Sequence, residues 1–517
     1  MIRKLSVLIL MFLFFKESKI FGYNENDIVL YPVVKSAERS ILFSTKTNGV
    51  SVFTEKFRDI SYANFAHNRP ASIEVKVEEK ILNWDISPKK NIKMARMVGN
   101  SVQFNLEKPG FHVLTINNKH RYFLLADKKE KGISATPKAK IIDIKSYGVD
   151  STGNKVETKL IQRALDETAR DKKILVFSSG IYRTGTLKIS SNANIYLAPG
   201  AVIKGSDDRN DYPADGNKKE SDHVNDKANF TDNGEWMTFS RLILIGEAEN
   251  VRIWGSGIID GNGRVVRAQG KPANLIRIRN SRNVTIEGIM LRDPASWNTH
   301  ILKSENITIR NVKILNDREV ANTDGFDPDA SQNVKIDNCF AYCGDDSIAI
   351  KNTNNSDLIQ DCDNIVIKNS VFITKKSALK VGTETKGNTM KNILFKNNTI
   401  LEGDRGMVLY CYDGAGFRNI KFLGNSFEKG YKSKNLKILH FEILSRNGQG
   451  SIKDILIKNS RVSSSFSTIS EISGLNNEHT VSGVRFKNFR LDGKMCSTPQ
   501  DIGLKANQFV KNLKITK

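Results

Sequence analysis

A short motif of the form Asn-apolar-x-apolar recurs along the chain and restricts the fold more than any other feature of the sequence. Successive copies lie 33, 23, 27, 31, 28 and 27 residues apart, and they begin at Asn250, Asn283, Asn306, Asn333, Asn364, Asn392 and Asn419. A period of this size is typical of solenoids, in which each repeat buries its apolar face only against its neighbours. Alternate apolar residues would point inward, and the asparagines would take left-handed corners and stack their amides.

The preferred hand of connections between parallel strands extends this prediction. We expect a right-handed parallel β-helix over residues 141–517 and an all-β fold class for the protein as a whole. An amphipathic stretch at Thr158 to Thr168 is the one convincing helix, with Leu160, Ile161, Ala164 and Leu165 on one face. We expect this helix to cap the open apolar end of the first coil.

The region before the repeats has a different pattern. Residues 23–127 contain short alternating runs such as Ser72 to Val77, separated by turn residues, which is the pattern of a small N-terminal β-sandwich. The charged residues 128–140 then indicate a linker between the two domains. The five cysteines show no metal-binding spacing, so we expect them to be small buried residues.

The first 22 residues have the features of a signal peptide. Arg3 and Lys4 precede the apolar run Leu5 to Phe15, and polar residues follow. We therefore expect a secreted or periplasmic protein. Eleven apolar residues are too few to span a bilayer, and no later segment is a candidate, so no membrane span is expected.

The formal net charge is +23, which favours anionic partners. The basic residues are spread along the chain with no aromatic-basic motif, so we expect no nucleic acid partner. Two interpretations remain open. The charge reflects either the Lys-rich composition of the whole chain or an acidic polysaccharide as the partner.

Two groups of acids stand out between Ala321 and Lys351. Asp324 lies in Asn-Thr-Asp-Gly, and Asp345 and Asp346 follow 21 and 22 residues later. If one coil takes about this many residues, the acids lie one above another at the strand spacing of about 4.8 Å. Turn chemistry explains many corner aspartates, and we assign Asp327 and Asp329 to it. Three stacked acids repel one another, however, so we predict that Asp324, Asp345 and Asp346 are catalytic.

Coil stacking also predicts which residues share the surface of these acids. The candidate substrate-binding residues lie on the coil of the acids, on the coil before it and on the two coils after it. They are Trp297, His300, Lys351, Lys380, Glu384, Arg405 and Tyr410. Such a set suits glycoside hydrolysis. One carboxyl must hold a proton for the leaving oxygen while another stays ionised to activate water, and crowded acids drive their pKa values apart.

Asn322 to Gly325, Gly344 to Lys351, Tyr147 to Asp150 and the Gly-x-Ile-Asp-Gly of residues 257–261 resemble glycoside hydrolase family 28, the polygalacturonases. The resemblance covers about residues 141–427. It implies a pectin-lyase-like β-helix, an inverting hydrolase without metal or cofactor, Asp345 as the general acid, and Asp324 and Asp346 as the groups that hold and activate water. The N-terminal sandwich before a β-helix is also similar to the layout of family 49, the dextranases and isopullulanase.

Two departures from family 28 concern the substrate. Polygalacturonases carry Gly-His-Gly one coil after the paired acids, where this chain has Lys376-Ser377-Ala378. They carry Arg-Ile-Lys one coil later, and the matching stretch of this chain, near Gly406 to Tyr410, has neither cation. Plain polygalacturonate is therefore not the expected substrate. We expect another acidic polysaccharide, uronate-containing or sulfated, held by Arg405, Lys380, Lys351 or His300. The alternative is a neutral α-glucan stacked on Trp297 or Tyr410.

Two other functions use the same fold. A polysaccharide lyase would remove a proton next to a uronate carboxylate with a Lys or Arg, and its product would absorb in the ultraviolet. A non-catalytic glycan-binding protein would bind without releasing reducing ends. Neither gives the acid cluster a reason, and the fold alone does not separate the three functions.

Overall fold

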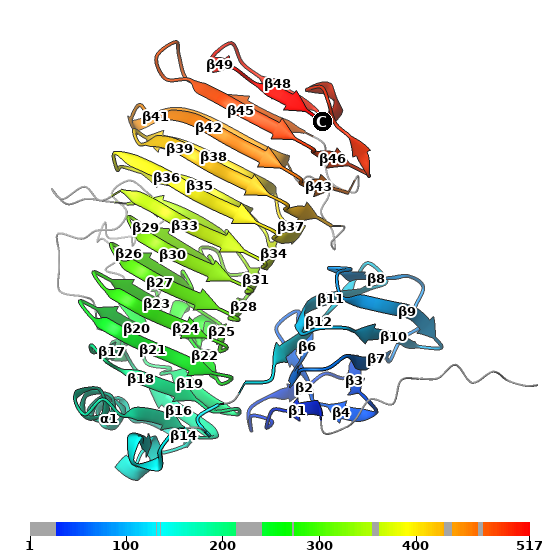
Figure 1. The fold of residues 1–517 in the computed structure, drawn as a ribbon. Helices are drawn as coiled ribbons and strands as arrows, with labels where there is room; N and C mark the ends of the chain where they lie inside the picture. Colours follow the sequence, from blue (N-terminus) through cyan, green and yellow to red (C-terminus); the bar gives the residue numbers. More distant parts are fainter. Residues whose placement is uncertain are drawn as a thin grey trace, which may run out of the picture.

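The structure is a computed structural model that describes residues 27–130, 132–134, 136–213, 240–270, 273–353, 361–428, 437–463 and 469–517. The predicted signal peptide lies outside these residues. The chain forms a small β-domain followed by a long stack of parallel strands, with the C-terminus at the far end of the stack (Figure 1). The predicted all-β, right-handed parallel β-helix with an N-terminal β-domain is confirmed. Among the described residues, no helix is long and apolar enough to cross a membrane.

The N-terminal domain is built from two sheets that enclose one apolar core. The first sheet is formed by β1 (Ile28–Leu30), β2 (Glu38–Arg39), β5 (Thr54–Phe57), β6 (Ile60–His67), β8 (Trp84–Ser87), β11 (Gly110–Ile116) and β12 (His120–Lys128). The second is formed by β3 (Phe43–Thr47), β4 (Val50–Val52), β7 (Ala71–Val77), β9 (Ile92–Val98) and β10 (Ser101–Leu106). Alternating burial along β7 shows one face of this strand in the core.

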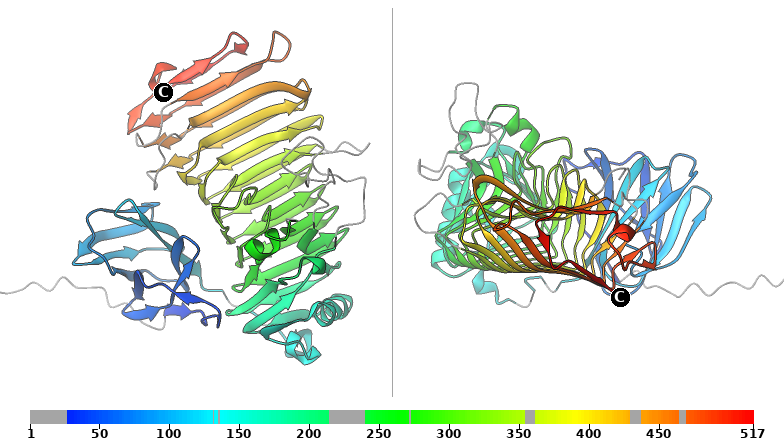
Figure 2. Two further views of the ribbon diagram at one scale, coloured as in Figure 1. Left: turned by 180° about the vertical axis from the view of Figure 1, so that it is seen from behind. Right: turned by 90° about the horizontal axis from the view of Figure 1, so that it is seen from above.

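The β-helix has three sheets, which we call sheets 1, 2 and 3, and their strands are parallel except for the last strand of sheet 2. Sheet 1 contains β13 (Ile141–Asp143), β15 (Ile174–Phe177), β18 (Asn194–Leu197), β21 (Glu249–Gly255), β24 (Arg282–Glu287), β27 (Glu305–Arg310), β30 (Gln332–Asp337), β33 (Cys362–Lys368), β36 (Thr389–Lys396), β39 (Gly416–Leu423), β42 (Ser451–Lys458), β45 (Val481–Lys487), β49 (Val510–Lys511) and β50 (Lys514–Thr516). Seen from above, the strands surround a common interior (Figure 2). One continuous cluster of buried apolar side chains fills this interior.

Sheets 2 and 3 complete each coil. Sheet 2 contains β14 (Thr152–Val156), β16 (Gly180–Thr184), β19 (Ala201–Gly205), β22 (Ile258–Asp260), β25 (Met290–Arg292), β28 (Lys313–Leu315), β31 (Phe340–Cys343), β34 (Val371–Thr374), β37 (Thr399–Glu402), β40 (Ser426–Phe427), β43 (Arg461–Val462), β46 (Arg490–Leu491) and β47 (Lys494–Met495). Sheet 3 contains β17 (Leu187–Ile189), β20 (Ser240–Gly246), β23 (Ala273–Arg279), β26 (Thr299–Leu302), β29 (Phe326–Asp329), β32 (Ile348–Asn352), β35 (Ser377–Thr385), β38 (Arg405–Asp413), β41 (Lys437–Gly448), β44 (Ser470–Ser473) and β48 (Leu504–Ala506).

Helices occupy the ends and corners. Helix α1 (Thr158–Arg170) covers the first coil with Ile161, Ala164 and Leu165 in the core, as predicted for a cap. The short helix α2 (Gly263–Arg267) and four 3₁₀ turns complete the described helices, and these turns are η2 (Lys138–Lys140), η3 (Ile144–Tyr147), η4 (Arg209–Asp211) and η6 (Gln500–Ile502). All five cysteines are unpaired and buried, as the sequence indicates.

The repeated asparagines adopt the predicted corner conformation. Each of the seven has φ between 53° and 58°. Their amides form parts of a ladder from coil to coil, with Asn364 Nδ2 donating to Asn333 Oδ1 at 2.7 Å and Asn419 Nδ2 donating to Asn392 Oδ1 at 2.6 Å. The left-handed corner and the ladder bond together explain why asparagine recurs at this position.

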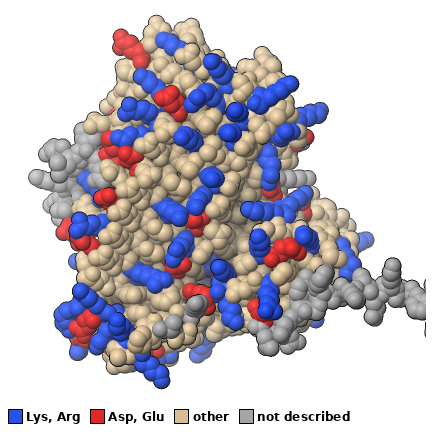
Figure 3. All heavy atoms as spheres, in the orientation of Figure 1, with Lys and Arg blue, Asp and Glu red and all other residues tan. Residues whose placement is uncertain are grey.

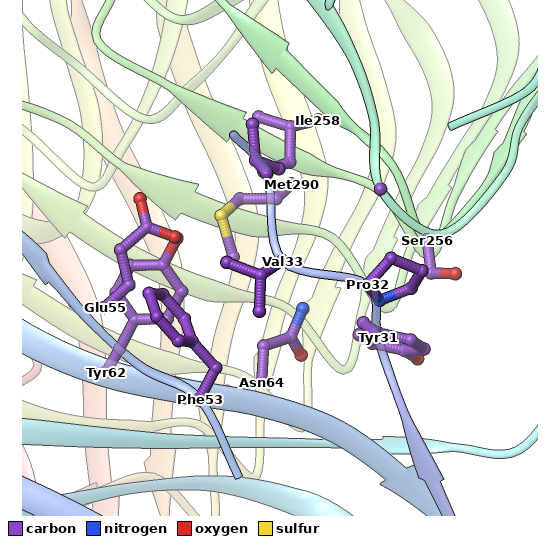
Figure 4. A pocket seen from close by; sticks show the side chains of 12 residues that line it. Tyr31, Pro32, Val33, Phe53, Glu55, Tyr62, Asn64, Ser256, Ile258 and Met290 are labelled. Carbon is purple, nitrogen blue, oxygen red and sulfur yellow. The ribbon is translucent and has the colours of Figure 1, made fainter. Parts of the chain in front are cut away.

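The N-terminal domain packs against sheet 2. Phe123 contacts Phe340 and Tyr342 edge to face at centroid distances of 5.1 and 5.2 Å. Buried ion pairs cross the same interface, among them Lys313 with Asp127 at 2.8 Å and Arg292 with Glu55 at 2.8 Å. A cavity of about 50 Å³ remains beside the Glu55 pair, between residues of both domains (Figure 4).

Candidate active site

The three predicted catalytic acids lie at the corner that leads into sheet 3. Phe326 of β29 pairs with Ile348 of β32, an offset of 22 residues that sets Asp324 level with Asp346 on the next coil. The Gly325 amide donates to the Asp346 carbonyl at 2.8 Å, which fixes this register. One carboxylate oxygen from each of Asp324, Asp345 and Asp346 lies within 4.8 Å of the others. Acids that lie about one coil apart in the sequence therefore form a cluster in space, as the period predicts.

Asp345 is the acid of this cluster that is only partly buried. Its carboxylate accepts hydrogen bonds from the Asn322 amide at 3.2 Å and from the Asp346 amide at 2.9 Å. Burial and the neighbouring Asp346 carboxylate nevertheless raise the pKa of Asp345. A carboxyl with a raised pKa that a substrate can reach is suited to donate a proton.

Asp346 has the opposite environment. Lys380 Nζ lies 2.7 Å from its Oδ2, and the Ser377 amide donates to its Oδ1 at 2.7 Å. Burial acts to raise the pKa of Asp346, but these two partners outweigh it and the pKa is lowered. Asp345 and Asp346 are therefore adjacent in sequence and driven apart in pKa, one toward the proton-bearing form and one toward the ionised form.

Asp324 faces two further charged groups. Lys351 Nζ lies 3.3 Å from Asp324 Oδ2 and 3.4 Å from Asp327 Oδ1. Burial raises the pKa of Asp324 well above its ordinary value, although Lys351 acts to lower it. Trp297 lies level with Asp324 one coil earlier, and Lys351 Nζ sits 3.5 Å from the centre of its ring. The indole and the acids thus hold the same ammonium group.

The assignment of Asp327 and Asp329 to turns is wrong. Both lie in strand β29 and are fully buried. Asp329 Oδ2 contacts His300 Nε2 at 2.9 Å and accepts a hydrogen bond from Thr353 Oγ1 at 2.6 Å. Burial raises the pKa of Asp327 to about 6, against the lowering effect of Lys351 and His300. His300 itself has no exposed surface, and its contact is with the buried Asp329.

The remaining candidates lie on the following coils of sheet 3. Arg405 pairs in register with Ser377, and its Nη1 reaches the Tyr410 hydroxyl at 3.4 Å. Tyr410 contacts His440 Nδ1 at 2.6 Å through the same hydroxyl. Glu384 lies close enough to raise the pKa of both Lys351 and Lys380. Arg405 therefore places a cation at the corner one coil beyond Ser377, although the Arg-Ile-Lys motif is missing.

The structure adds Asp327, His440 and Asn322 to the residues predicted from the sequence. Asp327 pairs with His300 across one coil, so its position could have been read from the same period that placed His300. The cluster of acid oxygens has the donor type of a cation site. Two of the three acids already have a lysine as partner, since Lys351 pairs with Asp324 and Lys380 pairs with Asp346.

Comparison with known proteins relates this site to described enzymes. A model of glycosyl hydrolases family 28 matches residues 214–429. The exo-poly-alpha-D-galacturonosidase of Dickeya chrysanthemi is 27% identical over 322 residues, which make up 53% of this chain and 52% of the relative. The chain spans about half the length of the curated relatives it matches.

Two solved structures share the fold. The exopolygalacturonase of Thermotoga maritima superposes with a TM-score of 0.57 at 19% identity, over 72% of this chain and 91% of the other. Dex49A of Penicillium minioluteum superposes with a TM-score of 0.54 at 11% identity, over 94% of this chain and 90% of the other. At these identities the likeness concerns the fold alone.

Proposed function

We propose that this chain, a relative of glycosyl hydrolases family 28, is an exported inverting hydrolase of a galacturonan-type, uronate-containing polysaccharide. The match to the family 28 model and the similarity to the curated relative confirm the resemblance to this family, and they support the activity of a glycoside hydrolase. The observation that carries the proposal is the cluster of three acids, in which Asp345 and Asp346 differ in the direction of their pKa shifts.

The proposed reaction assigns one role to each acid. Asp345 protonates the glycosidic oxygen as the bond to the anomeric carbon breaks. Asp346, kept ionised by Lys380, takes a proton from a water molecule that attacks the opposite face of the sugar, and Asp324 helps to hold this water. The inverted anomeric configuration of the product is what the resemblance to family 28 implies. The acid oxygens, within 4.8 Å of one another, are closer than the separation of about 6.5–9.5 Å that is usual for inverting pairs.

Arg405 supports an acidic substrate. Its guanidinium is partly buried and lies two coils beyond the acids, and among the described residues its one hydrogen-bond partner is the Tyr410 hydroxyl. A guanidinium of this kind can take a uronate carboxylate in a two-point contact.

The lysines argue against a lyase. Burial acts to lower the pKa of Lys351, but Asp327, Asp324 and Glu384 raise it well above its ordinary value. Burial also acts to lower the pKa of Lys380, but Asp346 and Glu384 raise it. Both side chains are therefore charged at neutral pH and have no lone pair with which to remove a proton.

The test is a reducing-end assay on polygalacturonate, branched galacturonans, sulfated glycans and a neutral α-glucan. We expect release from a galacturonan and none from Asp345→Asn, whose melting temperature should stay close to that of the parent. NMR of the first product should show the inverted anomer, and no absorbance of unsaturated uronate should develop. Full turnover by Asp345→Asn would remove the assignment of the acid.

Export is a separate part of the proposal. It rests on Arg3, Lys4 and the apolar run from Leu5 to Phe15. Expression of the full chain in a bacterial host, followed by N-terminal sequencing of the protein outside the cytoplasm, should give a mature form that begins near residue 23. An uncut chain that stays in the cytoplasm would contradict it.

A further inference from the structure

The segment of residues 316–325 connects β28 to β29 and carries Asp324 near its end, and we call it the Asp324 loop. Its second residue, Asp317, is 1% exposed and is held by two arginines. Arg264 Nε of α2 donates to Asp317 Oδ2 at 2.6 Å. Arg58 Nε of the N-terminal domain lies 3.5 Å from the same oxygen, while Arg58 Nη2 donates to Asp293 Oδ2 at 2.7 Å. The hydrogen bond to Asp317 thus comes from the β-helix, and Arg58 of the N-terminal domain adds an ion pair to the same oxygen.

The next loop residue has a link to the same domain. Arg318 and Arg121 both bind Glu402 of β37, one to each carboxylate oxygen. Arg121 lies on β12 of the N-terminal domain, and its Nη1 also donates to the Tyr342 hydroxyl at 2.9 Å. The side chains of Arg121, Arg318 and Glu402 are at most 10% exposed, so water screens these charges little.

The opposite end of the loop touches two of the catalytic acids. Asn316 Nδ2 bridges the loop by donating to the carbonyls of Thr323 and Asp324 at 2.8 and 3.1 Å. Thr323 Oγ1 accepts from the Gly344 amide at 3.2 Å, next to Asp345. The Asn322 amide donates to Asp345 Oδ2 at 3.2 Å. A shift at Asp317 is therefore passed to Asp324 through the backbone and to Asp345 through one hydrogen bond.

We propose that Arg58 is a positioning residue of the active site, through which the N-terminal domain holds the Asp324 loop and orients Asp324 and Asp345. The inference rests on the proposed function of these acids. It gives the N-terminal domain a part in the reaction even though the domain contributes no group to the acid cluster.

The inference predicts a particular change in pH dependence. The Asn322 amide stabilises the ionised form of Asp345, so loss of this bond makes the proton harder to remove. The other charged groups that face Asp345 are Asp346, Asp324, Lys380 and Lys351. Asp346, Lys380 and Lys351 lie outside the Asp324 loop and stay in place when Arg58 is replaced, whereas Asp324 moves with the loop. Because the general acid works while protonated, the alkaline limb of kcat should move to higher pH in Arg58→Ala.

The experiment compares Arg58→Ala with Arg58→Lys and with Glu55→Gln in the full chain. Glu55 is the matched control, since it lies three residues away on the same domain and pairs with Arg292 across the same interface, with no hydrogen bond or ion pair to the Asp324 loop among the described residues. Figure 4 shows Glu55 beside Tyr62 at the cavity between the domains. We expect kcat of Arg58→Ala to fall on the order of 10- to 100-fold with KM little changed, because small misplacements of catalytic groups have effects of this size. Arg58→Lys should recover part of the loss.

Hydrogen exchange provides a readout that does not depend on turnover. Amides of residues 316–325 should exchange faster in Arg58→Ala than in Glu55→Gln and the parent. If the parent cleaves no substrate, the proposed function fails while faster exchange still supports the loop contact. Equal exchange in Arg58→Ala and Glu55→Gln, or an active Arg58→Ala with an unmoved alkaline limb, would overturn the inference.

Discussion

Replacement of Lys380 by methionine removes the charge that keeps Asp346 ionised while it retains the length of the side chain. Lys380 Nζ and Asp346 Oδ2 are 2.7 Å apart, and both side chains are at most 11% exposed. At an effective dielectric constant of about 20, two unit charges at this separation attract each other by about 6 kcal/mol. Water that enters the vacated space recovers part of this energy. The rise in the pKa of Asp346 expected for the loss of one close opposite charge is therefore about 1 to 3 pH units, or about 1.4 to 4 kcal/mol.

The sign of the change follows from the role of Asp346. A general base must be ionised, so activity is lost as pH falls through its pKa. Loss of Lys380 raises that pKa because burial is then opposed by fewer partners. The acid limb of kcat/KM should therefore move upward by about 1 to 3 pH units, with activity partly recovered at higher pH.

The assay is a set of initial rates from pH 3 to pH 9 on the substrate identified for the parent. Lys76→Met is the control, since Lys76 forms a more exposed ion pair with Glu78 at 2.8 Å in the N-terminal domain, for which an effect of about 0 to 1 kcal/mol is expected. A Lys380→Met protein whose acid limb coincides with that of the parent would refute the assignment of Asp346 as the base. A folded protein with equal losses at every pH would refute it as well.

Two further predictions concern the substrate and the scaffold. Arg405→Ala should raise KM for an acidic polysaccharide about tenfold, which is about 1.4 kcal/mol, with little effect on the same polymer after carboxyl reduction; equal effects on both polymers would argue against a contact with carboxylate. Asn364→Ala should destabilise the fold by about 1 to 2 kcal/mol in urea unfolding, because alanine does not favour φ of 54° and lacks the amide that reaches Asn333. Asn364→Gly, which tolerates this backbone, should lose less, and the opposite order would exclude the corner conformation as the cause.

The period of the sequence repeat is sufficient to predict the β-helix and the cluster of the three acids. The offset of 22 residues between Asp324 and Asp346 is the register that the strands adopt. Asp327 was misread because Pro328 beside it favours a turn, whereas the pair lies within a strand of sheet 3. Column position leaves the direction of side chains open, so the sequence does not predict that Lys351 pairs with Asp324 and Lys380 with Asp346.

The repeat pattern of the sequence does not predict the contacts between the two domains. Arg58 meets Asp293 across 235 positions of the chain, and Arg121 meets Glu402 across 281. No repeat relates these residues, and the N-terminal domain has no motif of its own that indicates its docking face. The charge pattern does not predict the docking face either, since the basic residues are scattered over the visible face of the molecule among acidic ones (Figure 3).

The asparagine corners separate two properties that are coupled in most folds, namely the length of a connection and the alignment of the strand after it. Two residues join β29 to β30, whereas nine join β32 to β33, yet β30 and β33 pair side by side. Each coil is realigned at its own corner, so extra residues between sheets 3 and 1 leave the later columns undisturbed. The catalytic acids can stay fixed while the segments around them lengthen or shorten, which makes the corner loops the natural place for divergence of substrate preference.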